Sequence, residues 1–162
     1  MKTISIILAR GGSKGFPKKN IAEFCGKPLL AWTIEHCLNG GVEQVYVSSD
    51  SANILKIAED YSAVGIKRPE SLSGDKNDSE SGWLHALDVV EAECGTVDWV
   101  LAPQVTSPIR SPEDISEAVQ MAESGQYDSI FSVVPVTDFF MWKKKDSGQI
   151  NSINYDYHNR NL

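Results

Sequence analysis

Residues 3–20 read TISIILARGGSKGFPKKN, and this stretch decides the fold class. Residues 3–9 are aliphatic and β-branched and show no helical period, which predicts a buried strand. Three glycines and four cationic side chains follow within residues 10–20. Glycines let backbone amides approach an anion closely, and cations add charge-assisted hydrogen bonds. The stretch therefore predicts a strand that leads into an anion-binding loop.

The loop matches neither of two common phosphate-binding patterns. It lacks the four residues that separate glycine from Gly-Lys-Ser/Thr in a P-loop, and it is not the Gly-x-Gly-x-x-Gly of dinucleotide-binding folds. Judged on composition alone, an ordinary glycine-rich turn with solvated lysines is the alternative interpretation.

Strand and helix signals alternate along the rest of the chain. We predict helices at 28–38, 51–61, 79–93 and 111–122, and strands at 44–49, 64–67, 98–102 and 129–136. The alternation indicates an α/β fold with a mainly parallel sheet and helices on both faces. Because ligands bind at the carboxyl ends of parallel strands, loops 10–20 and 103–110 are expected to form one site.

Charge and composition exclude several classes of protein. The net charge of −7 argues against a nucleic-acid partner, whereas residues 1–27 hold six basic side chains and one acid, which suits a small polyanion. The longest apolar run near the N-terminus is too short to cross a membrane, so no membrane partner and a cytoplasmic location are expected. Three cysteines without a Cys-x-x-Cys pair predict reduced, mostly buried side chains.

Residues 8–20, with the pattern Leu-Ala-Arg-x-x-Ser-Lys-Gly-x-Pro-x-Lys-Asn, resemble the N-terminal signature of the acylneuraminate cytidylyltransferases, the CMP-sialic acid synthetases. Further stretches follow in the matching order: 47–50 (VSSD), 68–72 (RPESL), 104–110 (QVTSPIR) and 127–134 (YDSIFSVV). The resemblance spans nearly the whole chain. It implies a Rossmann-like nucleotidyltransferase fold, CTP as substrate, Mg²⁺ as cofactor and a homodimer.

The resemblance also implies a reaction and residue roles. The anomeric hydroxyl of a 2-keto sugar acid would attack the α-phosphorus of CTP, releasing pyrophosphate and forming a CMP-activated acidic sugar of the CMP-sialic acid type. Arg10 and Lys14 would be the catalytic residues that stabilise the departing pyrophosphate. The implied nucleotide-binding residues are Gly11, Gly12, Ser13 and Lys19 for the triphosphate, Asn20 for the ribose or a nearby phosphate, Arg68 and Ser79 for cytosine, and Gln104 for the ribose.

Some of these residues also have a purely structural interpretation. Arg68 could be a surface cation and Ser79 a helix N-cap. Asp50 or Ser51 is expected to cap the helix that follows, and Asp50 is not expected to act as a catalytic acid. The three histidines are scattered along the sequence and predict no metal cluster.

Two parts of the family pattern are missing. The family holds Mg²⁺ with an Asp-x-Asp pair in its C-terminal part, and no two aspartates here stand two apart, so no metal ligand is predicted in this chain. The arginine-rich stretch expected after residues 159–160 is also absent. We expect residues 1–135 to form the nucleotide-binding domain, and residues 136–162 to begin an incomplete dimerisation and acceptor-sugar segment. Such a truncated chain would bind CTP yet turn over slowly or not at all.

Three other functions fit the same sequence. One is a sister enzyme that acts on pseudaminic, legionaminic or ketodeoxyoctonic acid. Another is a CTP-binding module without turnover. The third is a purine-dependent or terpenoid-pathway nucleotidyltransferase of the same fold.

Overall fold

The computed structural model describes residues 1–13, 15–74, 77–133 and 142–152, which fall into two compact units, Met1–Ile130 and Phe131–Leu162. The domain boundary expected between residues 135 and 136 lies outside the described residues. No helix in the described ranges is long and apolar enough to cross a membrane.

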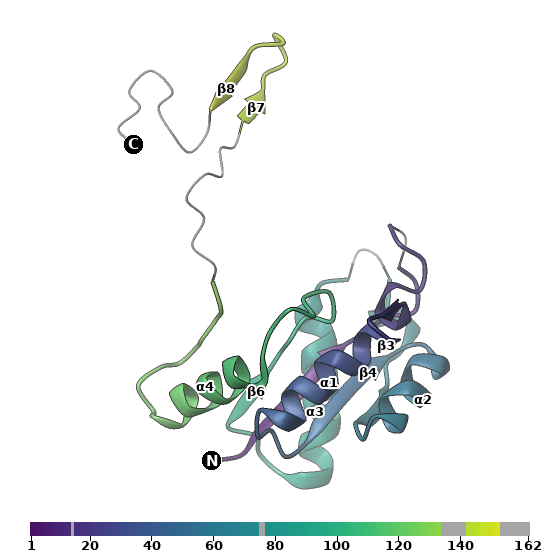
Figure 1. The fold of residues 1–162 in the computed structure, drawn as a ribbon, viewed down its shortest axis with the longest axis vertical. Coiled ribbons are helices and arrows are strands. Elements are labelled where there is room, and N and C mark those ends of the chain that lie inside the picture. Colours follow the sequence, from purple (N-terminus) through teal and green to yellow (C-terminus); the bar gives the residue numbers. More distant parts are fainter. Residues whose placement is uncertain (14, 75–76, 134–141, 153–162) are drawn as a thin grey trace. The chain divides into compact units, whose positions relative to one another are not determined.

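The first unit is built on a four-stranded parallel sheet (Figure 1). Its strands, in spatial order, are β5 (Val64–Lys67), β4 (Val45–Ser49), β1 (Thr3–Leu8) and β6 (Trp99–Leu101). Ser5 of β1 lies opposite Val45, and Thr3 lies opposite Trp99. Counted along the chain, the order is 3-2-1-4, which is that of a Rossmann-type sheet. The predicted α/β fold class is confirmed.

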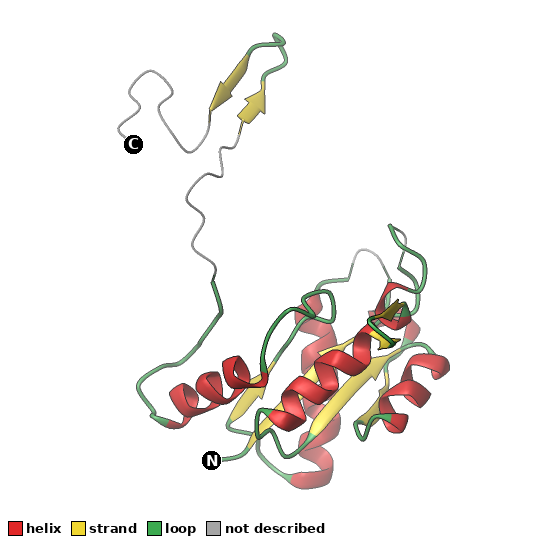
Figure 2. Cartoon of the chain, in the orientation of Figure 1, coloured by secondary structure: helices red, strands yellow, loops and turns green. Residues whose placement is uncertain are grey.

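Helices cover both faces of this sheet (Figure 2). One face carries α1 (Leu29–Asn39), α2 (Ala52–Asp60) and α4 (Pro112–Glu123), and the other carries α3 (Ser79–Cys94). The capping box predicted at the start of α4 is present, since Ser111 Oγ accepts from Asp114 N and Asp114 Oδ2 accepts from Ser111 N. The helices α1, α2 and α3 are the crossovers, and each returns the chain to the same edge of the sheet for the next parallel strand.

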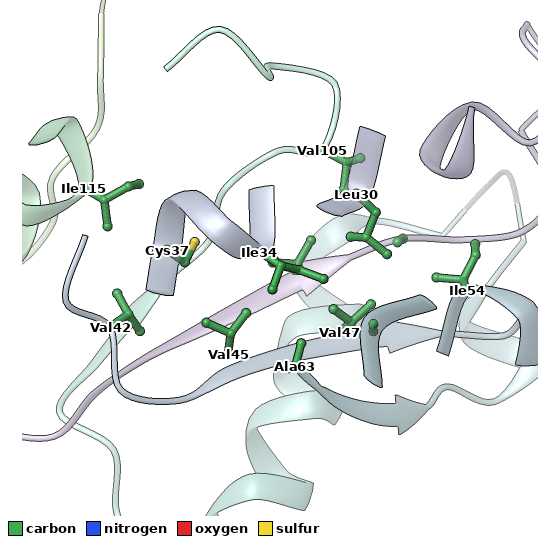
Figure 3. Close-up of a cluster of buried hydrophobic side chains, with 13 residues drawn as sticks. Leu30, Ile34, Cys37, Val42, Val45, Val47, Ile54, Ala63, Val105 and Ile115 are labelled. Atoms are coloured by element: carbon green, nitrogen blue, oxygen red, sulfur yellow. The ribbon is translucent and has the colours of Figure 1, made fainter. Parts of the chain in front are cut away.

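Alternating side chains of β1 serve two separate cores, as the twofold period of a strand requires. Ile7 packs with Val47, Leu30 and Ile34 in the cluster under α1 and α2 (Figure 3). Ile4 and Ile6 point to the opposite face and pack in the cluster under α3. Because β1 is buried on both faces, it gives the loop that follows it a rigid base.

Short elements complete the two units. A 3-10 turn, η1 (Lys19–Ile21), leads into the hairpin of β2 (Glu23–Phe24) and β3 (Lys27–Pro28). The two residues of the hairpin turn, Cys25 and Gly26, have φ values of 49° and 85°, and a type I′ turn needs positive φ at both positions. A second 3-10 turn, η2, spans Glu70–Leu72. In the second unit, β7 (Trp142–Lys144) and β8 (Ile150–Ser152) pair in antiparallel fashion.

Four sequence-based expectations of local structure are wrong. Residues 129–133 form no strand, because this exposed stretch pairs with no neighbour that would satisfy its backbone groups, and residues 134–136 lie outside the described part. Asp78, not Ser79, caps α3, with its Oδ1 accepting from Ser81 N at 2.7 Å. Neither Asp50 nor Ser51 caps α2 through its side chain. Cys25 and Cys94 are exposed, and Cys37 alone of the three cysteines is buried.

Candidate functional site

A cavity of about 500 Å³ opens at the carboxyl edge of the sheet. Its lining comes from the loop after β1, the loop after β5, the start of α3 and the loop after β6. In a 3-2-1-4 sheet the connections diverge between β1 and β6, and a crevice at that point is where open α/β sheets bind ligands. The volume falls within the range of small-molecule sites.

The cavity brings together most of the residues that the sequence singled out. Gly11 and Gly12 lie in the loop but do not line the cavity, and Lys14 lies outside the described residues. Three stretches that are far apart in the sequence meet here, and residues 68–83 join the two loops that were expected to form one site. The predicted residues that line the cavity are Arg10, Ser13, Lys19, Asn20, Arg68, Ser79 and Gln104.

Hydrogen bonds from two directions hold the glycine loop in place. The buried Asn20 side chain donates through Nδ2 to the Arg10 carbonyl at 3.0 Å. The Gly11 amide donates to Asp50 Oδ1 at 2.8 Å. A Cβ at Gly11 would lie 3.0 Å from Ser51 Cβ, so a larger residue here would press against the start of α2. Asn20 thus supports the loop as well as lining the cavity.

Arg68 is the most buried charged side chain of the site, with 5% of its surface exposed, so its interpretation as a surface cation is wrong. Its backbone amide donates to the Ser49 carbonyl at 2.9 Å, while its Nε is buried without a hydrogen-bond partner among the described residues. Burial lowers the pKa of Arg68 from its ordinary value. The positive charge of Arg10 lowers this pKa further, and the carboxylate of Asp50 opposes the shift.

Positive charge dominates the cavity although the protein as a whole is acidic. The described lining holds the cations Arg10, Lys19 and Arg68 and one carboxylate, Asp78. Asp78 already accepts from both the amide and the hydroxyl of Ser81, and these hydrogen bonds lower the pKa of its carboxyl. An anion is therefore the ligand that this arrangement favours.

Arg110 organises the loop after β6, although the sequence predicted no role for it. Its Nε and Nη2 donate to the Ser107 carbonyl at 3.0 and 2.8 Å, and Nη2 also donates to the Gln104 carbonyl. Burial lowers the pKa of Arg110, while the nearby Cys37 and Asp114 oppose that shift. Arg110 thus braces this loop through the Gln104 and Ser107 carbonyls. The sequence shows only an arginine several residues after a strand, and that pattern does not predict these contacts.

Trp83 is a second lining residue that carried no functional prediction. It lies one helical turn after Ser79 on α3, and its ring also packs against the core cluster that contains Ile4 and Ile6. The cavity lining thus includes an aromatic side chain as well as cations.

Sheet order and cavity together define an α/β fold of the Rossmann type with a ligand crevice at the carboxyl edge of its sheet. A solved structure of CMP:2-keto-3-deoxy-manno-octonic acid synthetase complexed with CTP shares this fold. Its TM-score is 0.65 at 22% identity, and the match covers 76% of this chain and 48% of that chain.

The family follows from the sequence comparisons. A family model described as cytidylyltransferase matches residues 4–151, and the chain belongs to this family. It is 37% identical over 145 residues to N-acylneuraminate cytidylyltransferase A of Danio rerio, covering 89% of this chain and 33% of the relative. It is 34% identical over 134 residues to the pseudaminic acid cytidylyltransferase of Campylobacter jejuni, covering 82% and 58%. The chain thus spans between a third and three fifths of these two relatives.

Proposed function

We propose that this chain binds CTP in the cavity at the carboxyl edge of the sheet. We further propose that the whole protein transfers CMP from CTP to an acidic 2-keto sugar and releases pyrophosphate. The observation that carries the proposal is the convergence of Arg10, Lys19 and Arg68 on one cavity of a cytidylyltransferase-family chain. A triphosphate carries anionic charge that complements these three cations.

The residues of the cavity divide into two groups by position. Arg10, Ser13 and Lys19 belong to the glycine loop and are proposed to bind the triphosphate. Arg68 and Ser79 flank the start of α3 and are proposed to contact the cytosine, with Gln104 on the ribose. Lys14 is proposed as a second catalytic cation beside Arg10. In transfer of a nucleotidyl group the protein mainly positions the reactants and neutralises charge, which is what a fixed cationic loop supplies.

Mg²⁺ is the cofactor that the family resemblance implies, and it would offset the negative charge of the triphosphate. The described residues do not fit a protein-bound Mg²⁺. No group of three or more His, Cys, Asp or Glu side chains lies close enough to hold a metal ion in the described ranges. The one lining carboxylate, Asp78, is already hydrogen-bonded to Ser81. We therefore derive no step of the reaction through the cation.

The acceptor is proposed at the level of a chemical class, an acidic 2-keto sugar. The two relatives named for acylneuraminic and pseudaminic acid match at 37% and 34% identity, and such similar values do not separate the two sugars. The homodimer and the cytoplasmic location expected from the sequence stay predictions for the whole protein.

The binding step is tested by calorimetric titration with CTP, UTP and ATP in the presence of Mg²⁺. We expect CTP to bind, and to stabilise the fold by about 2.7 kcal/mol at one hundred times its dissociation constant. Arg10→Ala should abolish binding, whereas Lys56→Ala, which removes an exposed cation of α2 outside the cavity, should not. Equal binding of ATP and CTP, or an Arg10→Ala variant as good as the wild type, would contradict the proposal.

The transfer step is tested on the whole protein. Pyrophosphate release is measured with CTP and a panel of acidic sugars that includes N-acetylneuraminic and pseudaminic acid. Release that depends on one of these acids would support the proposal and identify the acceptor. Binding of CTP without release in the presence of any 2-keto sugar acid would support the alternative, a binding module without turnover.

A further inference from the structure

We propose that Asp50 is a positioning residue, whose carboxylate fixes the Gly11 peptide and through it sets the anion-binding loop before the nucleotide enters. The proposal rests on the proposed function only for the identity of the ligand. Asp50 does not line the cavity, so it would act through the loop and not by touching the nucleotide.

The first step of the argument is the path of hydrogen bonds from Asp50 to the cavity. Asp50 follows β4, and its Oδ1 accepts from the Gly11 amide at 2.8 Å across 39 residues of sequence. The Gly11 carbonyl in turn accepts from the amide of Ser13 at 3.2 Å. Ser13 lines the cavity. Asp50 thus holds the first of the two peptide groups that meet at Gly11, and the second leads directly to the cavity-lining Ser13.

The second step is that Asp50 is not engaged by its own helix. The N-cap of α2 is Ser51, whose side chain makes no cap hydrogen bond among the described residues. The Asp50 carbonyl accepts a hydrogen bond from Lys67 Nζ, which ties the backbone of Asp50 to the end of β5. With its backbone hydrogen-bonded to Lys67 and its side chain to Gly11, Asp50 stabilises the loop after β1.

The third step is the charge of Asp50. The negative charge of Asp50 raises the pKa of Arg68, and the positive charge of Arg10 lowers it. One carboxylate therefore binds the glycine loop by a hydrogen bond and offsets the repulsion between two cations of the cavity. Removal of the charge and removal of the hydrogen-bond acceptor are separable by substitution.

Three variants separate these effects. Asp50→Asn keeps an oxygen that can accept from the Gly11 amide but removes the charge, whereas Asp50→Ala removes both. Asp98→Ala is the matched control, because Asp98 Oδ2 accepts from the Lys2 amide at 2.6 Å at the opposite end of β1. Asp98→Ala also removes a hydrogen bond from a backbone amide to a carboxylate, but before the start of β1 and away from the cavity.

The readout is the ratio of the dissociation constants for CMP and CTP, measured by calorimetry. The loop is proposed to bind phosphates that CMP lacks, so the ratio reports on the loop and not on general loss of structure. We expect Asp50→Ala to lower the ratio about tenfold, as loss of one charge-assisted contact would. Asp50→Asn should keep the ratio at or above that of the wild type, and Asp98→Ala should leave it unchanged.

Hydrogen exchange of the Gly11 amide tests the same inference without a ligand. In the free protein this amide should be protected in the wild type and in Asp50→Asn, and it should exchange about tenfold faster in Asp50→Ala. An unchanged ratio and unchanged protection in Asp50→Ala would overturn the inference, as would an Asp50→Asn variant that loses as much as Asp50→Ala. Failure of the wild-type chain to bind CTP would overturn the proposed function instead, and the exchange experiment would still decide on Asp50.

Discussion

Gly82 of α3 allows Arg68 to occupy its buried position, and Gly82→Ala is expected to weaken nucleotide binding more than it weakens the fold. A Cβ at this position would lie 3.0 Å from Arg68 Nη1 and 3.2 Å from Leu8 Cδ1. Relaxed carbon contacts lie at about 3.5–4.0 Å, so both neighbours must move by a few tenths of an ångström. Nη1 is the end of the flexible Arg68 side chain, and Arg68 lines the cavity. We therefore expect the guanidinium to move into the cavity.

Two opposing effects decide the stability of the Gly82→Ala variant. Alanine is better than glycine in a helix interior by about 1 kcal/mol, while overpacking a buried contact costs about 1–3 kcal/mol. The free energy of unfolding should therefore fall by about zero to 2 kcal/mol. Displacing a charged hydrogen-bond donor from its ligand costs about 1.5–3 kcal/mol, which corresponds to a dissociation constant for CTP roughly ten to a hundred times higher.

The assay pairs urea unfolding with calorimetric titration of CTP. Ala86→Gly is the matched control, because Ala86 lies one turn further along α3, is fully buried and packs in the core cluster under α3. It should lose stability by about 1 kcal/mol or more and keep its affinity for CTP. A folded Gly82→Ala variant with wild-type affinity would refute the reasoning, since Arg68 would then have no part in binding.

Three further predictions follow from the structure. Arg110→Lys removes the Nε donor to the Ser107 carbonyl and the planar guanidinium that orients Nη2 toward the Gln104 and Ser107 carbonyls. It should therefore lower the melting temperature by a few degrees and raise the dissociation constant for CTP several-fold; wild-type values of both in calorimetry would contradict this brace. Burial, aided by the positive charges of Arg110 and Lys27, lowers the pKa of His36 from its ordinary value of 6.5, so the unfolded chain binds the proton first as the pH falls. Stability should thus decline below about pH 6.5, and the decline should be smaller in His36→Phe, as melting temperatures between pH 7.5 and 5 would show; equal declines would exclude His36 as the cause. Gly40→Ala would bring a Cβ to 2.6 Å from Ile115 Cβ and 2.8 Å from the Pro112 carbonyl, which should cost about 3 kcal/mol in urea unfolding. Gly12→Ala, whose Cβ meets nothing within 4 Å, should cost less than about 0.5 kcal/mol, and equal losses in the two variants would contradict the packing argument.

Local patterns were enough to predict the layers of the fold. The apolar run of residues 3–9, the helix start at residues 111–114 and the glycine after α3 each act within a few residues, and each agrees with the structure. Strand 129–136 was predicted from the same kind of pattern and is absent from residues 129–133. A helix satisfies its own backbone, whereas a strand exists only where a neighbour pairs with it, and a single segment carries no record of that neighbour.

The site was predictable where residue type alone limits the chemistry, and not where contacts cross the sheet. A glycine-rich loop with cations after a buried strand indicates anion binding, and Arg10 and Lys19 do line the cavity. Asp50 was expected to cap the next helix because a local pattern favours that role. Its carboxylate binds an amide 39 residues away, and only the pairing of β1 with β4 brings the two together.

The charges of the cavity connect its stability to its proposed function. Arg68 is buried beside another cation, and both conditions lower its pKa, so the free protein holds this guanidinium at a cost in free energy. Asp50 offsets part of that cost and at the same time fixes the glycine loop. An anion that enters the cavity would remove much of the remaining free-energy cost of the buried Arg68 guanidinium. Ligand binding should therefore stabilise the fold most when the ligand carries the most negative charge. For this reason CTP should stabilise the protein more than CMP does, beyond the difference expected from their extra contacts with the loop alone.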